Sequence, residues 1–417
     1  MHINLLKINN SNMKTNKYKF MILTDEEFES FVSTHPLSNF FQSIYMKELL
    51  IKQGREVYLL GIKEEKNIVC ATLLVSSKCF IFKSYEALKG YLIDYNNYEL
   101  INLFTNYIKK FIRKKGGFRL IIDPYIIKKQ RDIDGNIIKN GIDNTNIIKY
   151  LKSIKFKEIN NNQVKWTFVL DTNKNINDLL NDMRPNTRNA INKTLDKYKL
   201  VVEELSYDKL DIFKKITQDT SKRRNFNDRS LKYYQDIYTS FKNNIKVLVC
   251  KLDVQLYINT LLNEKEHLIN KINNLSDSNS NIKKKKNFKN EILNIDNKIN
   301  YMTNISKNNE KYIILSGAMF IMYGNEIVYL FSGSYEEFMK FNGQYRLQYE
   351  MIKYASLNNY KRYNFYGIYL DKNSKDYGVY EFKKGFNGYV EELLGAFEVK
   401  VTFIYYIYNL LKKIFKK

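Results

Sequence analysis

The sequence predicts an α/β fold in which one α/β unit occurs twice and a pair of long helices is inserted into the second copy. Strand-length apolar runs alternate with helical repeats of apolar residues, and this order recurs in the second half of the chain. Residues 257–309 carry a helical pattern alone. The chain has 417 residues. Because a domain typically contains roughly 100–200 residues, about two or three domains are expected.

The first copy is expected to begin with a helix near residues 24–34, whose acidic start suits the positive end of a helix dipole. Its other expected elements are strands at 56–62, 68–75 and 79–83, a helix from Leu100 to Ile112 and a strand at 118–122. Apolar residues three or four positions apart predict the longer helix, and Gly116 and Gly117 end it.

The second copy repeats this order of strands, helix and strand. Its expected elements are strands at 244–252, 312–322 and 327–331, a helix with Leu347, Met351, Ile352 and Ala355 on one side, and a strand at 362–365. The repetition predicts two tandem domains of the same kind.

The insertion has the narrow apolar stripe of a coiled coil. Apolar residues alternate at spacings of three and four from Ile258 to Leu275 and again from Phe288 to Met302, with Lys265 at one core position. The polar stretch 276–287 is expected to form the tip of an antiparallel hairpin of about 30 Å. Lys283–Lys286 at that tip suits a polyanion or is only solvated, and a helical pair lying flat on the domain stays an alternative.

Composition excludes several classes of protein and indicates an anionic partner. Abundant aromatic residues exclude disorder throughout, three scattered cysteines (Cys70, Cys79 and Cys250) exclude a disulfide scaffold, and three distant histidines disfavour a histidine-based metal site. The net charge of +24 favours nucleic acid or anionic lipid. An AT-rich coding bias is the alternative source of the lysines. No signal peptide or membrane span is predicted, so a cytoplasmic protein is expected.

We divide the chain into a first domain at 1–165, a second domain at 166–256 plus 310–395, the coiled-coil arm at 257–309, and a basic amphipathic segment at 396–417. That last segment joins apolar aromatic residues to Lys412, Lys413, Lys416 and Lys417. It either lies in the interface of an anionic membrane or docks as a helix with a basic tail.

Eight segments together resemble one family. They are LSNFFQSIYMKELL (37–50), LKGYLIDY (88–95), LIIDPY (120–125), NDMRPNTRNAINK (181–193), YLFSGS (329–334), YRLQYEMIKYA (345–355), YNFYGI (363–368) and GVYEFKKGFNG (378–388). Their order, with the helical arm, resembles the FemA/FemB branch of the Fem aminoacyltransferases over about residues 19–411. The resemblance implies two tandem GNAT-type acyltransferase domains with an inserted arm.

The resemblance also implies a reaction and its partners. The amino acid, glycine by default, would pass from aminoacyl-tRNA to the stem-peptide amine of a lipid II-type peptidoglycan precursor, without a metal or cofactor. The enzyme would work in the cytoplasm, peripheral at the anionic inner membrane face, alone or paired with itself or relatives. Both substrates are polyanions, which suits the charge.

The implied catalytic residues are Asp123 and Lys383. Asp123, at a strand end, would orient the acceptor amine or take its proton; the alternative is a turn residue before proline. Phe382 would stack on the terminal adenine of the tRNA, and Lys383 would neutralise the oxyanion or a phosphate. The alternative for this pair is a strand with an inward Phe382 and a solvated Lys383, and the neighbouring Lys384 leaves the register open.

The resemblance places further substrate-binding residues. Arg229 and Tyr233, four apart, would contact the acceptor's nucleotide or diphosphate, or belong to a surface helix. Phe331 occupies a position where the family often has a tyrosine, so the hydrogen bond that the tyrosine hydroxyl would make is in doubt here. Phe118 likewise stands where one relative has a tyrosine. The family's lysine near the first helix aligns with Leu49, and Lys47 is not assigned its role.

A basic helix that begins at Pro185 is a candidate track for tRNA phosphates. Its cations are Arg184, Arg188 and Lys193, with Lys197 beyond them. An ordinary charged helix face is the alternative.

Two other functions stay open. A CoA-dependent acyltransferase of the same fold would need a glycine-containing pyrophosphate loop, and the surroundings of Gly324 and Gly343 do not match one. A non-catalytic tRNA- or membrane-binding relative is compatible with Phe331, Phe118 and the missing lysine.

Overall fold

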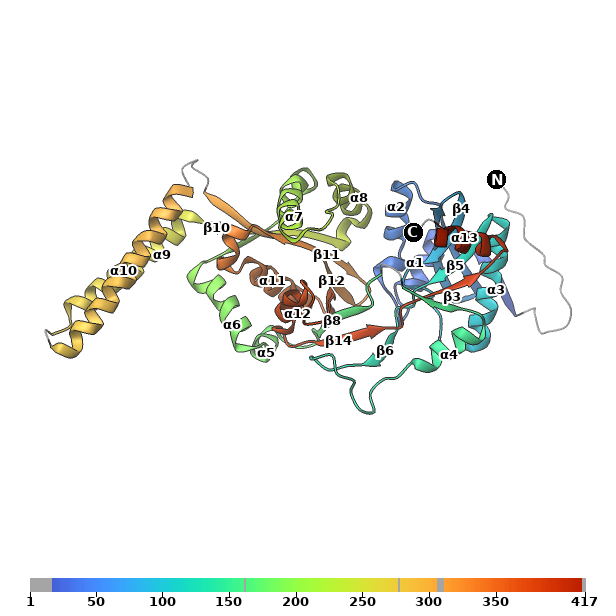
Figure 1. The fold of residues 1–417 in the computed structure, drawn as a ribbon, viewed down its shortest axis with the longest axis horizontal. Helices are drawn as coiled ribbons and strands as arrows, with labels where there is room; N and C mark the ends of the chain where they lie inside the picture. Colours follow the sequence, from blue (N-terminus) through green and yellow to red (C-terminus); the bar gives the residue numbers. More distant parts are fainter. Residues whose placement is uncertain (1–16, 161–162, 277, 306–310, 415–417) are drawn as a thin grey trace. The chain divides into compact units, whose positions relative to one another are not determined.

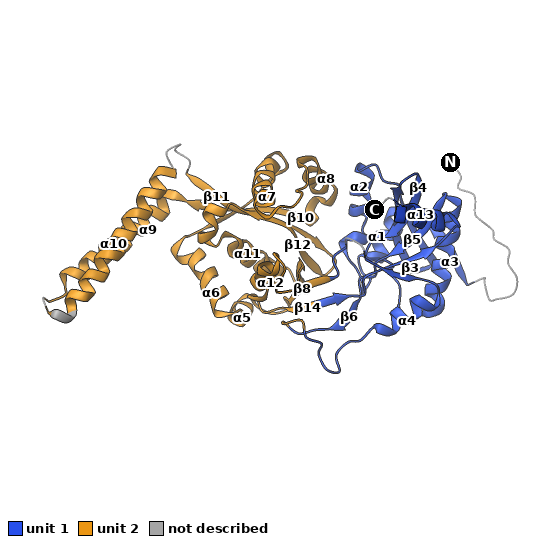
Figure 2. Ribbon diagram, viewed as in Figure 1, with its two compact units in different colours: residues 1–132, 136–165, 391–417 blue, residues 133–135, 166–390 orange. Residues whose placement is uncertain are grey.

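The structure, a computed structural model, describes residues 17–160, 163–276, 278–305 and 311–414 (Figure 1). Two of the lysines assigned to the basic tail, Lys416 and Lys417, lie outside the described residues. The chain forms two compact units (Figure 2). Unit 1 contains residues 1–132, 136–165 and 391–417, and unit 2 contains 133–135 and 166–390.

Unit 1 is built on a seven-stranded sheet with the strand order β1-β2-β3-β4-β5-β15-β7. Its strands are β1 (Tyr18–Ile22), β2 (Val57–Glu64), β3 (Asn67–Cys79), β4 (Phe82–Ala87), β5 (Gly117–Ile122), β7 (Lys157–Ile159) and β15 (Ala396–Lys400). Its helices are α1 (Asp25–Val32), α2 (Ile44–Lys52), α3 (Tyr98–Lys114), α4 (Thr145–Ser153) and α13 (Ile404–Ile414). The pair β4–β5 is parallel and is joined through α3, whose apolar side buries Phe104, Ile108 and Ile112.

Unit 2 repeats this arrangement around its own sheet, in the order β14-β8-β13-β12-β11-β10-β9. Its strands are β8 (Trp166–Asp171), β9 (Val201–Glu204), β10 (Ile245–Asp253), β11 (Tyr312–Tyr323), β12 (Glu326–Ser334), β13 (Arg362–Gly367) and β14 (Tyr389–Leu393). Its helices outside the arm are α5 (Ile176–Asp182), α6 (Pro185–Asn192), α7 (Leu210–Arg224), α8 (Leu231–Phe241), α11 (Gly343–Leu357) and α12 (Tyr377–Lys384). The last residues of β14 belong to unit 1, where they pair with β6 (Ile127–Gln130).

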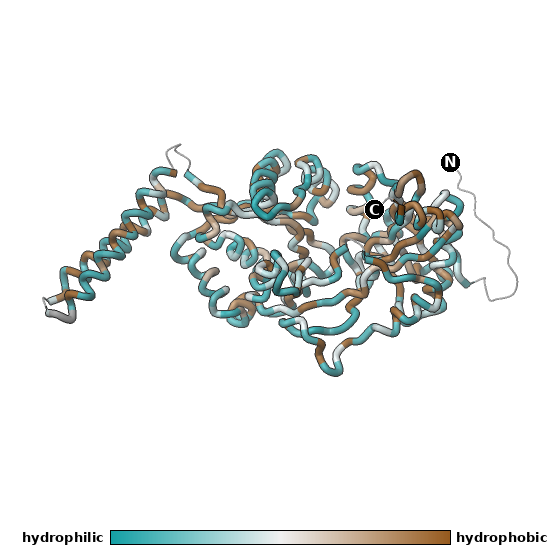
Figure 3. The backbone as a smooth tube through the Cα atoms, viewed as in Figure 1, coloured by the Kyte–Doolittle hydropathy of each residue, from teal (hydrophilic) through white to brown (hydrophobic). Residues whose placement is uncertain are grey.

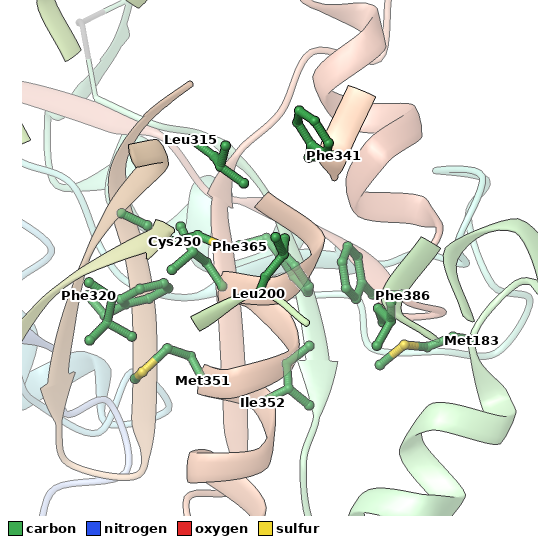
Figure 4. Packing of buried hydrophobic residues seen from close by; sticks show 14 of the residues in the cluster. Met183, Leu200, Cys250, Leu315, Phe320, Phe341, Met351, Ile352, Phe365 and Phe386 are labelled. Carbon is green, nitrogen blue, oxygen red and sulfur yellow. The ribbon is translucent and has the colours of Figure 1, made fainter. Parts of the chain in front are cut away.

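The predicted repetition is visible in the parallel strand pairs. In unit 2, β12 and β13 are parallel and are joined through α11, as β4 and β5 are through α3. Helix α11 buries Met351 and Ile352 in a core with Phe320 of β11 and Phe365 of β13 (Figure 4). Each unit thus contains a strand, a covering helix and a parallel strand.

Two expectations for unit 1 are wrong. The strand expected at 79–83 is misplaced: Phe80 and Ile81, which are 53% and 89% exposed, form a turn, whereas Cys79 ends β3 and the next strand, β4, runs from Phe82 to Ala87. The end of the chain also differs from its expected assignment. Residues 391–395 were assigned to the second domain and 396–417 set apart, but β15 pairs with β5 and β7 inside the first sheet. The pairing of β15 with strands that are distant in the sequence produces no pattern within residues 396–400, so the sequence does not reveal it.

The arm consists of α9 (Val254–Asn273) and α10 (Asn279–Ile305), which pack against each other. Figure 3 shows that hydrophilic residues dominate both helices. Lys265 at the predicted core position forms an ion pair with Asp296 of the facing helix, 2.7 Å away. The predicted tip at 276–287 is too long, since Lys283–Lys286 already lie in α10. Lysine is a good helix former, so a polar run does not by itself end a helix.

Candidate functional site

The candidate site is a pocket of about 610 Å³ in unit 2. It opens where two parallel strands separate: β12 and β13 pair only from Glu326 to Val328 and from Arg362 to Asn364. The residues that follow on both strands line the pocket. Helix α7 closes against β12 at Gly333, where a Cβ atom would lie 2.7 Å from the carbonyl oxygen of Ile216. The pocket therefore results from the way the central strands of this unit diverge.

Lys383 is buried at the border of this pocket. It lies in the last turn of α12, and its Nζ donates a hydrogen bond of 2.7 Å to the carbonyl oxygen of Gly367 at the end of β13. Burial lowers the pKa of the Lys383 ammonium to about 7. At neutral pH the side chain therefore exists both as an ammonium and as an amine.

The alternative of a strand with a solvated Lys383 is wrong. The segment is helical, Lys383 is 4% exposed, and the neighbouring Lys384 points elsewhere, to the carboxylate of Asp134 at 2.5 Å. The position of Lys383 depends on close contact between α12 and α6. A Cβ at Gly385 would meet the Thr187 hydroxyl of α6 at 2.0 Å, so this approach requires glycine.

Aromatic rings form one wall of the pocket. The ring of Phe382 meets that of Tyr345 edge to face at a centroid distance of 4.9 Å, and both residues line the pocket. Phe386, in the core behind them, lies 5.4 Å from Phe382. A half-buried ring supported in this way offers an apolar surface to a flat ligand.

Phe331 connects the pocket with Arg229 and Tyr233. Phe331 lines the pocket from β12, and Tyr233, in the first turn of α8, meets its ring edge to face at 6.0 Å. The exposed guanidinium of Arg229 lies 5.0 Å from the centre of the Tyr233 ring. The structure thus brings Phe331, Phe382 and Lys383 together in one pocket, with Tyr233 and Arg229 extending from it.

Tyr329 and Gln344 also line the pocket, and the sequence did not single them out. The Tyr329 hydroxyl lies 2.5 Å from the Ser332 hydroxyl and 3.1 Å from Oε1 of Gln344. Nε2 of Gln344 donates to the carbonyl oxygens of Gly317 and Gly333. This network supplies hydroxyl groups beside Phe331, which has none. Gln344 lies on α11 and bonds to groups of β11 and β12, so no pattern within a single element reveals the network.

The three predicted tRNA-binding cations lie in or next to α6 and do not line the pocket. Arg184 precedes α6, and its Nη1 lies 3.5 Å from the carboxylate of Glu381 on α12. Arg188 donates to the carbonyl oxygens of Asn181 and Met183, whereas the exposed Lys193 follows α6. Arg184 and Lys193 are therefore more accessible to a phosphate than Arg188.

Asp123 lies in unit 1, and its carboxylate is bound by a lysine that the sequence did not single out. Nζ of Lys89 lies 2.7 Å from Oδ2 of Asp123 and 2.8 Å from the carbonyl oxygen of Val164. Both side chains are buried, and burial raises the pKa of Asp123 and lowers that of Lys89. A lysine among apolar neighbours in LKGYLIDY is the only signal the sequence offers for this pair.

The remaining residues of unit 1 have structural explanations. Leu49 is a buried core residue, and Lys47 forms a surface ion pair with Asp25 at 2.5 Å. Phe118 is fully buried, with its ring 4.7 Å from that of Tyr408. A ring in that apolar contact does not need a hydroxyl.

No helix in the described part of the chain is long and apolar enough to cross a membrane.

Solved structures with the same fold define its class. A structure described as FemX matches with a TM-score of 0.74 and 23% identity, over 94% of this chain and 99% of that one. A tandem GNAT protein from the clavulanic acid biosynthesis pathway matches with a TM-score of 0.50 and 8% identity, over 93% and 99% of the two chains. The fold is therefore that of two tandem GNAT-like acyltransferase domains, as expected.

Sequence comparison identifies the family within this class. The model of the FemAB family matches residues 23–413. Aminoacyltransferase FemA of Staphylococcus epidermidis is 31% identical over 95% of this chain and 100% of its own length. The chain belongs to the FemAB family, and it is an aminoacyltransferase.

Proposed function

We propose that the protein transfers an amino acid, glycine by default, from aminoacyl-tRNA to the stem-peptide amine of a lipid II-type precursor and so builds the interpeptide bridge of peptidoglycan. The observation that carries the proposal is the meeting of Lys383, Phe382 and Phe331 at one pocket in unit 2. The relatives named FemA support the same reaction class.

The donor end of the reaction is assigned to α12. The aromatic wall of Phe382 and Tyr345 suits stacking with the terminal adenine of a tRNA. Lys383 stands next to it in a desolvated position, where an ammonium stabilises negative charge far better than in water. Arg184 and Lys193 are the candidate contacts to the tRNA phosphates, and the chain's charge of +24 suits that partner.

The acceptor is assigned to the side of the pocket that leads to Arg229. A forked guanidinium 5.0 Å from the centre of the Tyr233 ring suits the two oxygens of a phosphate. The acceptor precursor carries a diphosphate, so Arg229 would hold it while Tyr233 and Phe331 pack against its less polar parts. Asp123 belongs to unit 1, where it is buried and paired with Lys89, and it is not assigned to this pocket.

The chemistry needs positioning more than covalent catalysis. The amine nitrogen attacks the ester carbon, a C–N bond forms, and the bond from that carbon to the tRNA 3′-oxygen breaks. The amine loses a proton and the leaving 3′-oxygen gains one. Protonated Lys383 would stabilise the oxyanion of the tetrahedral intermediate. With a pKa of about 7, it is also able to pass a proton to the leaving oxygen at neutral pH.

The experiment is transfer with purified protein, charged tRNA and lipid II, with the product identified by mass. Addition of one amino acid per lipid II supports the proposal, and a panel of charged tRNAs identifies the donor. Binding of tRNA without any transfer would indicate a non-catalytic relative. Transfer from acyl-CoA would indicate the other acyltransferase reaction.

A further inference from the structure

Helix α13 of unit 1 is apolar on two sides. Its inner side buries Tyr405 and Tyr408 against Phe118. The outer stripe is a second set of apolar residues at spacings of three and four, and it is exposed to solvent. Its members are Phe403 (72% exposed), Ile407 (42%), Leu410 (60%) and Ile414 (58%). A helix with apolar residues on two sides normally has both sides covered, so the outer stripe points to a partner.

A second segment adds apolar surface next to this helix. The turn between β3 and β4 carries Phe80 and Ile81, of which Ile81 is 89% exposed. The ring of Phe80 lies 6.0 Å from that of Tyr408 on α13. The turn therefore lies beside the inner side of α13, through Tyr408, and adds the exposed side chain of Ile81 to the apolar surface around this helix.

Cations surround this apolar surface. The basic rim consists of Lys109, Arg113, Lys157, Lys400 and Lys413. Arg113 donates to the carbonyl oxygen of Val401, and Nζ of Lys400 lies 3.0 Å from the Tyr406 hydroxyl, which places both at the start of α13. Burial and the positive charges of Arg113 and Lys400 lower the pKa of Lys109. Within the described residues, no carboxylate forms an ion pair with any member of the rim.

We propose that the outer stripe of α13, the turn at Phe80 and Ile81 and the basic rim together dock unit 1 on the surface of an anionic lipid bilayer. The apolar side chains enter the boundary between headgroups and acyl chains, and the rim contacts the acidic headgroups. The helix is too short to cross the bilayer, so the contact is interfacial.

A bilayer explains the surface better than two other occupants. RNA would suit the cations, and Phe403 offers it a ring for stacking, but Ile407 and Leu410 offer none and would stay in water. A second copy of the chain would cover the apolar stripe. A two-fold symmetric contact would, however, bring two basic rims together without carboxylates between them.

The test is sedimentation of the full chain with vesicles of phosphatidylcholine alone or in equal parts with phosphatidylglycerol. We expect binding to the mixed vesicles, weakened by salt, and little binding to phosphatidylcholine. Ile407→Ser with Leu410→Ser should weaken binding by about tenfold or more. Lys400→Gln with Lys413→Gln should weaken it by about tenfold or more as well.

The matched control is Leu293→Ser on α10, because Leu293 is as exposed as Leu410, at 60%. This control should bind like the unchanged chain. Leu410→Ser alone is compared with this control. The proposal is overturned if the mixed vesicles do not bind the chain, if the control loses as much binding as Leu410→Ser, or if the variants instead lose dimerisation or tRNA binding. Vesicle binding is measured without substrates, so its failure is distinct from a failure of the proposed transfer reaction.

Discussion

Nζ of Lys89 lies 2.7 Å from Oδ2 of Asp123, and the two side chains are only 3% and 1% exposed. The pair ties the segment after β4 to the end of β5, the two parallel strands of unit 1. Two charges in such a dry position depend on each other, because removal of one leaves the other buried and uncompensated.

Lys89→Met should therefore lower the free energy of unfolding by about 3–5 kcal/mol at neutral pH, as measured by urea denaturation. The double variant Lys89→Met with Asp123→Leu should recover most of the loss, since no buried charge is left. A single variant as stable as the unchanged chain, or a double variant less stable than either single one, would contradict this interpretation.

The same variant should show a distinct pH dependence. Burial already raises the pKa of Asp123, and loss of Lys89 raises it further. A carboxyl whose pKa is higher in the folded than in the unfolded state lowers stability as the pH rises above about 4. The deficit of Lys89→Met should consequently be small in acid and large at neutral pH. A deficit independent of pH would argue that lost packing is the cause.

Lys383 should make stability depend on pH in the alkaline range. Its pKa is about 7 in the folded protein against an ordinary value of 10.5, so the unfolded chain binds the extra proton between these values. The free energy of unfolding should rise with pH across that window, by on the order of a few kcal/mol. Lys383→Met should remove this rise. Identical slopes for the two proteins would show that Lys383 is not the titrating group.

Lys383→Ala should reduce transfer by about a hundredfold or more, in the range found for loss of one oxyanion-stabilising donor. The matched control is Lys384→Ala, since that lysine is the next residue but forms an ion pair with Asp134 instead of bordering the pocket. Initial rates at saturating substrate check the effect. Equal losses in both variants would remove the special role of Lys383.

Phe382→Leu should raise the KM for charged tRNA by roughly tenfold or more and change kcat less, because base stacking contributes about 1–3 kcal/mol. Phe41→Leu, at a half-buried phenylalanine of unit 1, is the control and should leave this KM unchanged. A change in kcat alone would place Phe382 at the reacting atoms and not at the adenine.

Arg229→Ala should raise the KM for the lipid-linked acceptor by about tenfold or more, the size expected for a charged hydrogen bond to phosphate. Arg229→Lys should restore only part of the affinity, because lysine lacks the forked donors. Lys232→Ala provides the control from α8, the helix that follows Arg229, because Lys232 is exposed and paired with Asp236. If Lys232→Ala has the same effect, general surface charge is the explanation.

Local sequence patterns predict most of the helices and strands. The predictions fail where pairing with distant segments determines the structure. The apolar spacing in α3 and the repeated strand, helix and strand were readable from the sequence. The membership of β15 in the first sheet was not, because it depends on partners at β5 and β7. Phe80 and Ile81 were predicted to lie in a strand because they are apolar, but they form a turn and their side chains are exposed outside the core.

The candidate site was predictable only where the family resemblance names a position. That resemblance selected Phe382, Lys383 and Phe331, which the structure brings to one pocket. It did not select Lys89, which pairs with Asp123 at the end of another strand. Nor did it select Tyr329, which bonds to Gln344 of helix α11. Pairs of this kind exist only after folding.

The most direct test of the proposed reaction is the mass of lipid II after incubation with charged tRNA and either the unchanged protein or Lys383→Ala. We predict that the unchanged protein adds one amino acid and that the variant, folded to the same extent, adds almost none. An unchanged lipid II mass with every charged tRNA, or full addition by Lys383→Ala, would contradict the proposal.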